Sequence, residues 1–186
     1  MKTSPDAVFR ALNALGIIAI CLVLAFALAD QFYMRELPCP LCLLQRVGFV
    51  AVAIGLLMNV VLGSHMAHYG FSVVAGLCGG AAALRQVSLH VIPGTPAYGE
   101  PFLGLHFYTW AFILFGTIIF GIAVLASFQA QYGSSVKRLA WSEQTWLCKL
   151  SIASAIMIVA LNFLSTFALC GPGVCPDDPV GYWLMS

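Results

Sequence analysis

The sequence has very little charge. Only 8% of its 186 residues are Asp, Glu, Lys or Arg, whereas soluble domains average about 25%. Hydrophobic residues make up 61% of the chain, and the mean hydropathy is +0.96. A core formed by a chain of this size cannot bury so much apolar surface, but a bilayer accepts it when segments of about 20 residues are helical. The composition therefore predicts a membrane protein.

The sequence also lacks a basic surface. The net charge is +1 and the sequence pI is about 7.6, whereas domains that bind nucleic acid commonly have a pI above about 9. We therefore expect no nucleic acid partner. No internal repeat or low-complexity segment divides the chain, so we expect residues 1–186 to form one membrane domain.

Five long apolar segments follow one another along the chain. They run over about 11–32, 41–63, 71–92, 105–127 and 148–169. Each is close to the length of about 20 residues with which a helix crosses a bilayer. The predicted fold class is therefore all-α, an integral membrane helix bundle, followed by a tail over 170–186.

The start of the chain also resembles a signal peptide. Lys2 and Arg10 precede an apolar run that reaches Ala27-Leu28-Ala29, a typical cleavage pattern. The run is longer than the usual apolar core of a signal peptide, so we expect it to remain as the first span. Cleavage would leave the orientation of the other spans unchanged.

Lysine and arginine are absent from the 93–104 connection and from the tail. They gather before the first span and around the 128–148 connection, at Lys2, Arg10, Lys137, Arg138 and Lys149. Short loops rich in these residues face the cytoplasm. We therefore expect a cytoplasmic N-terminus, with the 33–40 and 93–104 connections and the tail facing outward.

This orientation sorts the seven cysteines. Cys39, Cys42, Cys170 and Cys175 fall at the outer surface, where an oxidising compartment allows thiols to pair. Cys21 and Cys78 fall within spans, and Cys148 falls near the inner surface. The sequence therefore predicts two outward cysteine pairs.

The first pair forms the motif Cys39-Pro40-Leu41-Cys42 at the start of the second span. A thiolate there faces the unpaired N–H groups of a helix N-terminus, which favour negative charge. Proline is well tolerated in the first helical turn. The motif predicts a reactive dithiol, and the alternatives are a structural disulfide or a metal site.

The second pair bounds the segment Cys170-Gly171-Pro172-Gly173-Val174-Cys175. Glycine and proline favour a turn, and the spacing permits a disulfide. We expect a mobile pair that exchanges with the first pair by direct contact, because thiol–disulfide exchange proceeds through a mixed disulfide. The alternative is a static clip on the tail.

Polar side chains near the outer ends of the spans are candidates for a binding site. Arg46 lies four residues after Cys42, on the same helical face. An arginine within a span is usually functional, and we expect Arg46 to stabilise a thiolate or to donate to a quinone oxygen. The alternative is a side chain that reaches to the lipid headgroups. Arg85, Gln86 and His90 are expected to line a polar pocket with Arg46, although His90 also fits an interfacial histidine.

The segment from Gly104 to Trp110 opens the fourth span. His106 is expected to assist proton transfer, because imidazole titrates near neutral pH. The aromatic residues here also fit an ordinary interfacial belt. No metal site is predicted.

The run from Pro38 to Arg46, with Arg85-Gln86-Val87, Gly104-Leu105-His106 and Tyr108-Thr109-Trp110, resembles the bacterial DsbB family of disulfide bond formation proteins. The resemblance covers about residues 10–128. It implies a four-helix core that holds ubiquinone or menaquinone in the bacterial inner membrane and reoxidises a periplasmic thioredoxin-fold oxidant of the DsbA kind. It also implies that Cys42 and Arg46 face the quinone and that Cys39 exchanges with a second pair.

One feature departs from the family pattern. Family members usually carry the second cysteine pair between spans three and four, but the 93–104 connection contains no cysteine. A fifth span follows the four-helix core instead. We expect Cys170 and Cys175, which come after that span, to replace the missing pair.

The predicted function is a membrane disulfide oxidoreductase, a quinone-dependent thiol oxidase with its N-terminus in the cytoplasm and its C-terminus in the periplasm. One alternative is a transporter of soft metal ions that uses the paired cysteines. Another is a membrane haem or electron-carrier subunit that uses His90 and His106.

Overall fold

The computed structural model describes residues 5–95, 97–133, 138–177 and 179–185. Its five long helices are α1 (Pro5–Tyr33), α2 (Pro40–Leu62), α3 (Met66–His90), α4 (Phe107–Ala126) and α5 (Trp146–Cys170). Short 3-10 turns follow as η1 (Gln129–Gln131), η2 (Trp141–Glu143) and η3 (Trp183–Met185). All five long helices are long and apolar enough to cross a membrane. The predicted all-α membrane bundle with a fifth helix is confirmed.

The helices extend beyond the predicted apolar segments mainly at two N-termini. Helix α1 begins at Pro5 rather than about 11, because Asp6 in its first turn pairs with Arg10 one turn later. Helix α3 begins at Met66 rather than about 71, because the His65 side chain caps it by accepting from the Ala67 N–H. Apolar run length detects neither feature, since both depend on polar side chains.

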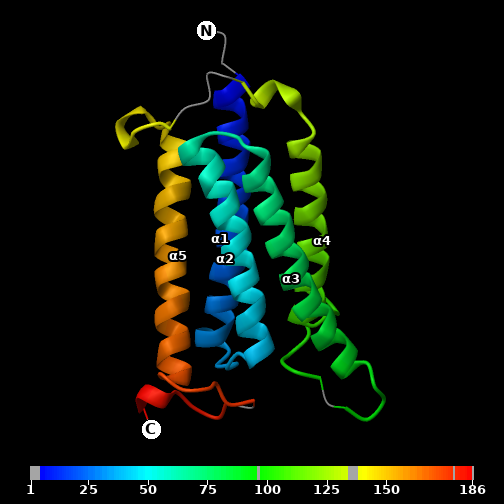
Figure 1. The fold of residues 1–186 in the computed structure, drawn as a ribbon. Coiled ribbons are helices and arrows are strands. Elements are labelled where there is room, and N and C mark those ends of the chain that lie inside the picture. Colours follow the sequence, from blue (N-terminus) through cyan, green and yellow to red (C-terminus); the bar gives the residue numbers. More distant parts are fainter. Residues whose placement is uncertain (1–4, 96, 134–137, 178, 186) are drawn as a thin grey trace.

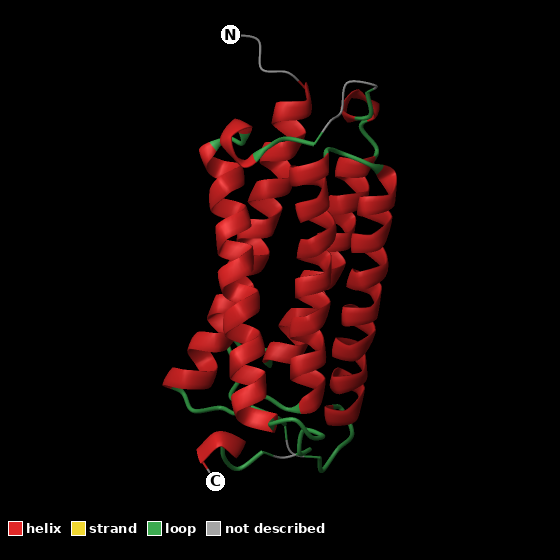
Figure 2. Ribbon diagram, turned by 60° about the vertical axis from the view of Figure 1, so that its left-hand side comes forward, coloured by secondary structure: helices red, strands yellow, loops and turns green. Residues whose placement is uncertain are grey.

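The helices run up and down, and the two termini lie at opposite ends of the bundle (Figure 1). We call the end with both cysteine pairs and the C-terminus the cysteine end, and the opposite end the amino end. Helix α1 packs against α2 and α5, α2 packs against α3, and α3 packs against α4. The turned view shows the same lengthwise packing (Figure 2). Lys2, Lys137 and Asp178, which bear on the predicted orientation, lie outside the described residues.

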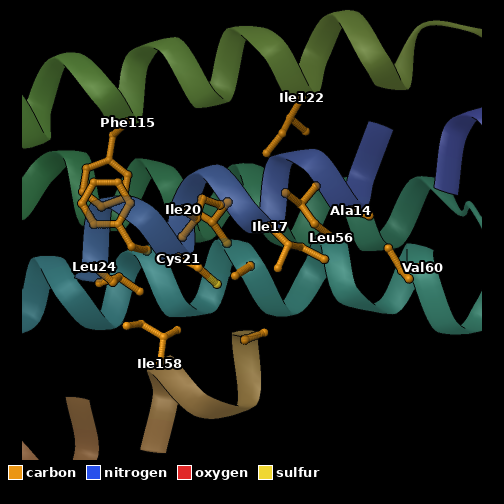
Figure 3. Packing of buried hydrophobic residues seen from close by; sticks show 14 of the residues in the cluster. Ala14, Ile17, Ile20, Cys21, Leu24, Leu56, Val60, Phe115, Ile122 and Ile158 are labelled. Atoms are coloured by element: carbon orange, nitrogen blue, oxygen red, sulfur yellow. The ribbon is translucent and has the colours of Figure 1, made fainter. Parts of the chain in front are cut away.

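The larger of two apolar clusters among the described residues joins all five long helices. The Phe115 ring of α4 stacks on Phe49 of α2, with ring centroids 4.0 Å apart. It can reach α2 because Gly79 of α3 leaves space, and a Cβ atom at Gly79 would collide with the ring. Leu24 of α1 and Ile158 of α5 belong to the same buried cluster (Figure 3). The fifth helix is therefore part of the bundle core.

A buried polar network closes the amino end. Arg10, which is 2% exposed, donates to the Asp6 carboxylate at 2.8 Å and to the Val60 carbonyl at 2.6 Å. Next to it, Asn13 donates to the Tyr69 hydroxyl, which donates to Gln131, each at 2.8 Å. These groups hydrogen-bond one another away from water, as buried polar groups must.

Candidate redox site

The first cysteine pair forms a disulfide at the first turn of α2. Cys39 is the N-cap residue, and its Sγ accepts from the Cys42 N–H at 3.2 Å. Pro40, with no N–H to leave unpaired, begins the helix. Cys39 is buried and Cys42 is half-buried. The helix N-terminus thus directs a donor at the sulfur, as the sequence predicted.

One glutamine contacts both sulfurs of this disulfide, and a second glutamine orients the first. Gln86 Nε2 lies 3.3 Å from Cys39 Sγ and 3.4 Å from Cys42 Sγ, in position to donate to both. Gln45 Nε2 donates to Gln86 Oε1 at 2.7 Å and so fixes which end of that amide faces the sulfurs. Both side chains are nearly inaccessible to solvent. A thiolate formed on either cysteine would find a preorganised N–H donor there.

Gln45 was not among the predicted site residues. Its signal in the sequence is an uncharged polar residue three positions after Cys42, within a strongly apolar segment. The prediction considered mainly ionisable residues in the spans, and an amide is also costly there unless it is hydrogen-bonded.

A cavity of about 540 Å³ lies between α1 and α4, beside α2. Its walls are mainly apolar and aromatic and include Phe26, Phe49, Phe107, Tyr108 and Trp110. Polar groups reach it from Cys42, Gln45, Arg46 and Gln86, and the carboxyl residues Asp30 and Glu36 also line it. Arg46 and Gln86 therefore share a pocket as predicted, but that pocket is largely apolar rather than polar. Among the four cysteines of the cysteine end, Cys42 lines the cavity and Cys39 does not.

Arg46 is held by neutral acceptors on α1. Its Nη1 donates to Gln31 Oε1 at 2.8 Å and its Nη2 to the Ala27 carbonyl at 2.9 Å. These bonds keep the guanidinium between α1 and α2, against the cavity, instead of extending it to the lipid headgroups. Among the described residues, the one ion pair is that of Asp6 and Arg10 at the other end.

Arg85 does not line the cavity, contrary to the prediction. It is exposed, whereas the next residue, Gln86, is buried at the disulfide. Consecutive residues of an α-helix point about 100° apart, so both cannot face the same pocket. The structure thus separates these two predicted site residues.

His90 and His106 reach the cavity only indirectly. Their rings stack against Tyr108, with centroids 5.1 Å and 5.3 Å from its ring. His90 Nδ1 contacts the Gln86 carbonyl at 2.8 Å, and His106 Nδ1 contacts the Gly99 carbonyl at 3.1 Å. Since a carbonyl only accepts, each Nδ1 carries the proton. Tyr108, which the prediction omitted, is the cavity residue of this group.

The 91–106 connection covers the cavity at the cysteine end. The Tyr98 hydroxyl donates to the Leu37 carbonyl, and the Glu100 N–H donates to the Glu36 carboxylate at 3.0 Å. The Phe102 ring packs against Phe26 of α1, with centroids 5.3 Å apart. This connection, which carries no cysteine, is therefore fastened to the segment just before the first cysteine pair.

The second pair, Cys170 and Cys175, also forms a disulfide, directly after α5. Cys170 belongs to a buried cluster with Leu43 and Leu169, and Cys175 and Leu37 pack against that cluster. Leu37 and Leu43 flank the first motif in the sequence. The tail turns back at Gly171, whose φ of +64° suits glycine. The structure thus brings both pairs to the same end of the bundle, where the second pair packs on an apolar cluster formed with the leucines next to the first motif.

Comparison with known families identifies the first half of this arrangement. The family described as "Disulfide bond formation protein DsbB" matches residues 9–100, which include α1, α2, α3 and the first cysteine pair. The chain belongs to the DsbB family. The match ends before Gly104, so the predicted resemblance up to residue 128 extends beyond it.

Relatives in the DsbB family agree over the same region. "Disulfide bond formation protein B" of Xanthomonas axonopodis pv. citri is 36% identical over 90 residues, covering 46% of this chain and 52% of its own. The protein of the same name from Aromatoleum aromaticum is 35% identical over 94 residues, covering 46% and 54%. The chain thus spans about half the length of the curated relatives it matches. No solved structure matches the chain significantly.

Proposed function

We propose that the protein is a membrane disulfide oxidoreductase that oxidises dithiols of an extracytoplasmic thioredoxin-fold partner and passes the electrons to a membrane quinone. The observation that carries the proposal is the position of Cys42. Its sulfur lines an apolar cavity together with a guanidinium and an amide. An electron acceptor bound there would be next to one end of the disulfide, while Cys39 stays outside the cavity.

The cavity fits a quinone in chemistry. Aromatic and aliphatic walls suit a flat ring and its hydrocarbon tail, and a few convergent polar groups suit its oxygens. Arg46 and Gln86 would hold those oxygens. A bound quinone would take up the two electrons and two protons that are released when a dithiol becomes a disulfide.

The chain's own sulfurs carry the preceding steps. A partner thiolate attacks the Cys170–Cys175 disulfide, and the partner's second thiol resolves the mixed disulfide, which leaves the partner oxidised and this pair reduced. A thiolate of the reduced pair then attacks Cys39 in the Cys39–Cys42 disulfide. The leaving thiolate is Cys42, at the cavity, where Gln86 donates to it. Resolution by the remaining tail thiol returns the second pair to a disulfide and leaves Cys39 and Cys42 reduced.

We place both pairs on the periplasmic side of a bacterial inner membrane, with the N-terminus in the cytoplasm. The support is the absence of Lys and Arg from the 93–104 connection and from the tail. In intact cells, a membrane-impermeant maleimide added after reduction should label Cys175. A Cys175 that reacts only after the membrane is opened would contradict this orientation.

The relay is tested by trapping. In Cys42→Ser, the Cys39 thiol has no neighbour to pair with, so it should attack the Cys170–Cys175 disulfide and remain bonded to one of its sulfurs. Nonreducing electrophoresis of the full-length protein followed by peptide mapping should detect this cross-link. The matched control is Cys148→Ser, which removes a buried thiol near the amino end and should not form it. Absence of the cross-link would show that the two pairs do not exchange.

A further inference from the structure

One side chain, Gln31, joins three parts of the protein at the cysteine end. It lies near the end of α1 and is 1% exposed. Its Oε1 accepts from Arg46 Nη1 at 2.8 Å and from Ser165 Oγ at 3.1 Å. Its Nε2 donates to the Tyr182 hydroxyl at 3.0 Å. Helix α2, helix α5 and the C-terminal tail therefore meet at a single amide.

Tyr182 belongs to the segment that carries the second cysteine pair. It packs on the cluster of Leu43, Leu169 and Cys170, and its ring stacks on Phe32 of α1 with centroids 6.5 Å apart. Its hydrogen bond to Gln31 is thus, with the ring contact to Phe32, one of the contacts that dock the tail on α1. Displacement of the tail by a docking protein would break it.

The amide transmits that change because it is planar and rigid. Nε2 and Oε1 belong to one group, so an Nε2 that has lost its acceptor in a buried site turns to find another. The same rotation moves Oε1, which holds Nη1 of Arg46. The remaining bond of this guanidinium to α1 is the one to the Ala27 carbonyl, which cannot fix its orientation alone.

We propose that Gln31 is a positioning residue that links the docking of the C-terminal tail to the setting of Arg46 in the cavity. With the tail docked, both ends of the amide are held and the guanidinium is fixed. With the tail displaced, the amide is held at Oε1 alone and the guanidinium is released. The inference rests on the proposed function in treating Arg46 as a cofactor contact.

Linkage of this kind is reciprocal: if the tail fixes Arg46, then Arg46 must help to hold the tail. The test therefore measures the tail first, without any quinone. The reduced full-length protein is treated with a maleimide, and the labelling rate at Cys175 is followed by peptide mass spectrometry. The variants are Gln31→Leu, Tyr182→Phe and Arg46→Met. The control is Asn162→Ala, a buried amide of α5 that donates to its own helix at Ile158.

Gln31→Leu and Tyr182→Phe should label about three- to tenfold faster than wild type, the range expected for one lost buried hydrogen bond. Arg46→Met should label about two- to threefold faster, because Ser165 still holds the amide. Asn162→Ala should label at the wild-type rate. If Gln31→Leu labels faster but Arg46→Met does not, the tail is anchored without any link to the guanidinium, and the proposal is wrong. Unchanged labelling in Gln31→Leu would also overturn it.

A second measurement tests the consequence at the cavity. Tyr182→Phe keeps the ring that stacks on Phe32 and should raise the KM for a short-chain quinone about threefold, with kcat within about twofold. A KM equal to that of wild type would contradict the link. If the wild-type protein reduces no quinone, the proposed function fails, while the labelling pattern still decides whether Gln31 joins the tail to Arg46.

Discussion

Each end of the bundle buries an arginine, and the two are held differently. At the amino end, Arg10 pairs with the Asp6 carboxylate, and amides and hydroxyls fill the surrounding space. At the cysteine end, Arg46 is bonded to an amide oxygen and a carbonyl and faces a cavity of about 540 Å³. The Arg10 charge is neutralised by a carboxylate at hydrogen-bond distance. Arg46 is hydrogen-bonded to neutral groups, and the Asp30 carboxylate acts on it only from beyond ion-pair distance, so its charge remains more available to an incoming negative charge. From this comparison we propose a structural role for the amino end and a chemical role for the cysteine end.

The same contrast holds for sulfur. Cys148 is buried near the amino end and is a free thiol, whereas Cys42 lines the cavity in a disulfide. This difference in surroundings, rather than the residue type, is the reason that we propose Cys42 and not Cys148 as a reactive cysteine.

The largest difference in turnover between the two ends should appear when one cysteine at each end is replaced by serine. Cys42→Ser should abolish quinone reduction by a dithiol partner, because no disulfide can form at the cavity. Cys148→Ser should keep turnover near the wild-type rate. Steady-state quinone reduction in proteoliposomes measures both, and substantial turnover by Cys42→Ser would break the comparison.

Replacing the two arginines should separate binding from stability. Arg46→Met should raise the KM for a short-chain quinone about ten- to a hundredfold, since a hydrogen bond to a charged group contributes about 1.5–3 kcal/mol. Arg10→Met should leave that KM near the wild-type value and lower the free energy of unfolding by about 1–3 kcal/mol, because it leaves Asp6 without its partner.

Thermal unfolding in detergent, measured alongside the kinetics, completes this comparison. If Arg46→Met and Arg10→Met lose the same free energy of unfolding and have the same KM, the two arginines are equivalent. The division between the two ends would then be wrong.

Gln86→Leu tests the donor at the disulfide. Without that N–H, a thiolate of the reduced first pair is less stable, and alkylation of Cys42 by iodoacetamide should slow about three- to tenfold. Gln45→Leu should show the same direction with a smaller effect, because it disturbs only the orientation of Gln86. Asn59→Leu should leave the alkylation rate unchanged, because the buried Asn59 amide belongs to the amino-end network, where it donates to Asn13 Oδ1 at 3.1 Å.

The smallest effect is expected from Tyr69→Phe. The hydroxyl joins Asn13 to Gln131 in the amino-end network, and its removal should lower the free energy of unfolding by about 1–2 kcal/mol. Quinone reduction should be unchanged. A large loss of turnover with normal stability would give the amino end a role in the chemistry.

The five helices could be predicted because a helix that crosses a lipid bilayer needs about 20 apolar residues, and the length of an apolar segment can be counted in the sequence. The position of Gln86 next to the first pair could not be derived, because it depends on how α3 is rotated against α2. That rotation is set by Gly79 and Phe115, whose fit is a property of three helices together. The grouping of Arg85 with Gln86 failed for a different reason, which is that consecutive residues of a helix point about 100° apart.

The cavity itself was only partly predictable. Arg46 was expected near Cys42 because four residues make one helical turn. Gln31 was not considered, since its partners Ser165 and Tyr182 come from residues more than 130 positions later in the chain. Local patterns carry no information on such long-range partners. The buried uncharged amides in the spans, Gln31 and Gln45, were the signal that was available.

The first turn of α2 is capped by a sulfur atom, that of Cys39. Ordinary caps are oxygens whose charge does not change during function. In the proposed cycle the capping atom would alternate between a neutral disulfide sulfur and, after reduction, one that can carry a full negative charge against the positive end of the helix. The first turn of α2 would therefore be more stable in the reduced half of that proposed cycle than in the oxidised half, so that the redox state of the pair would be coupled to the stability of the helix.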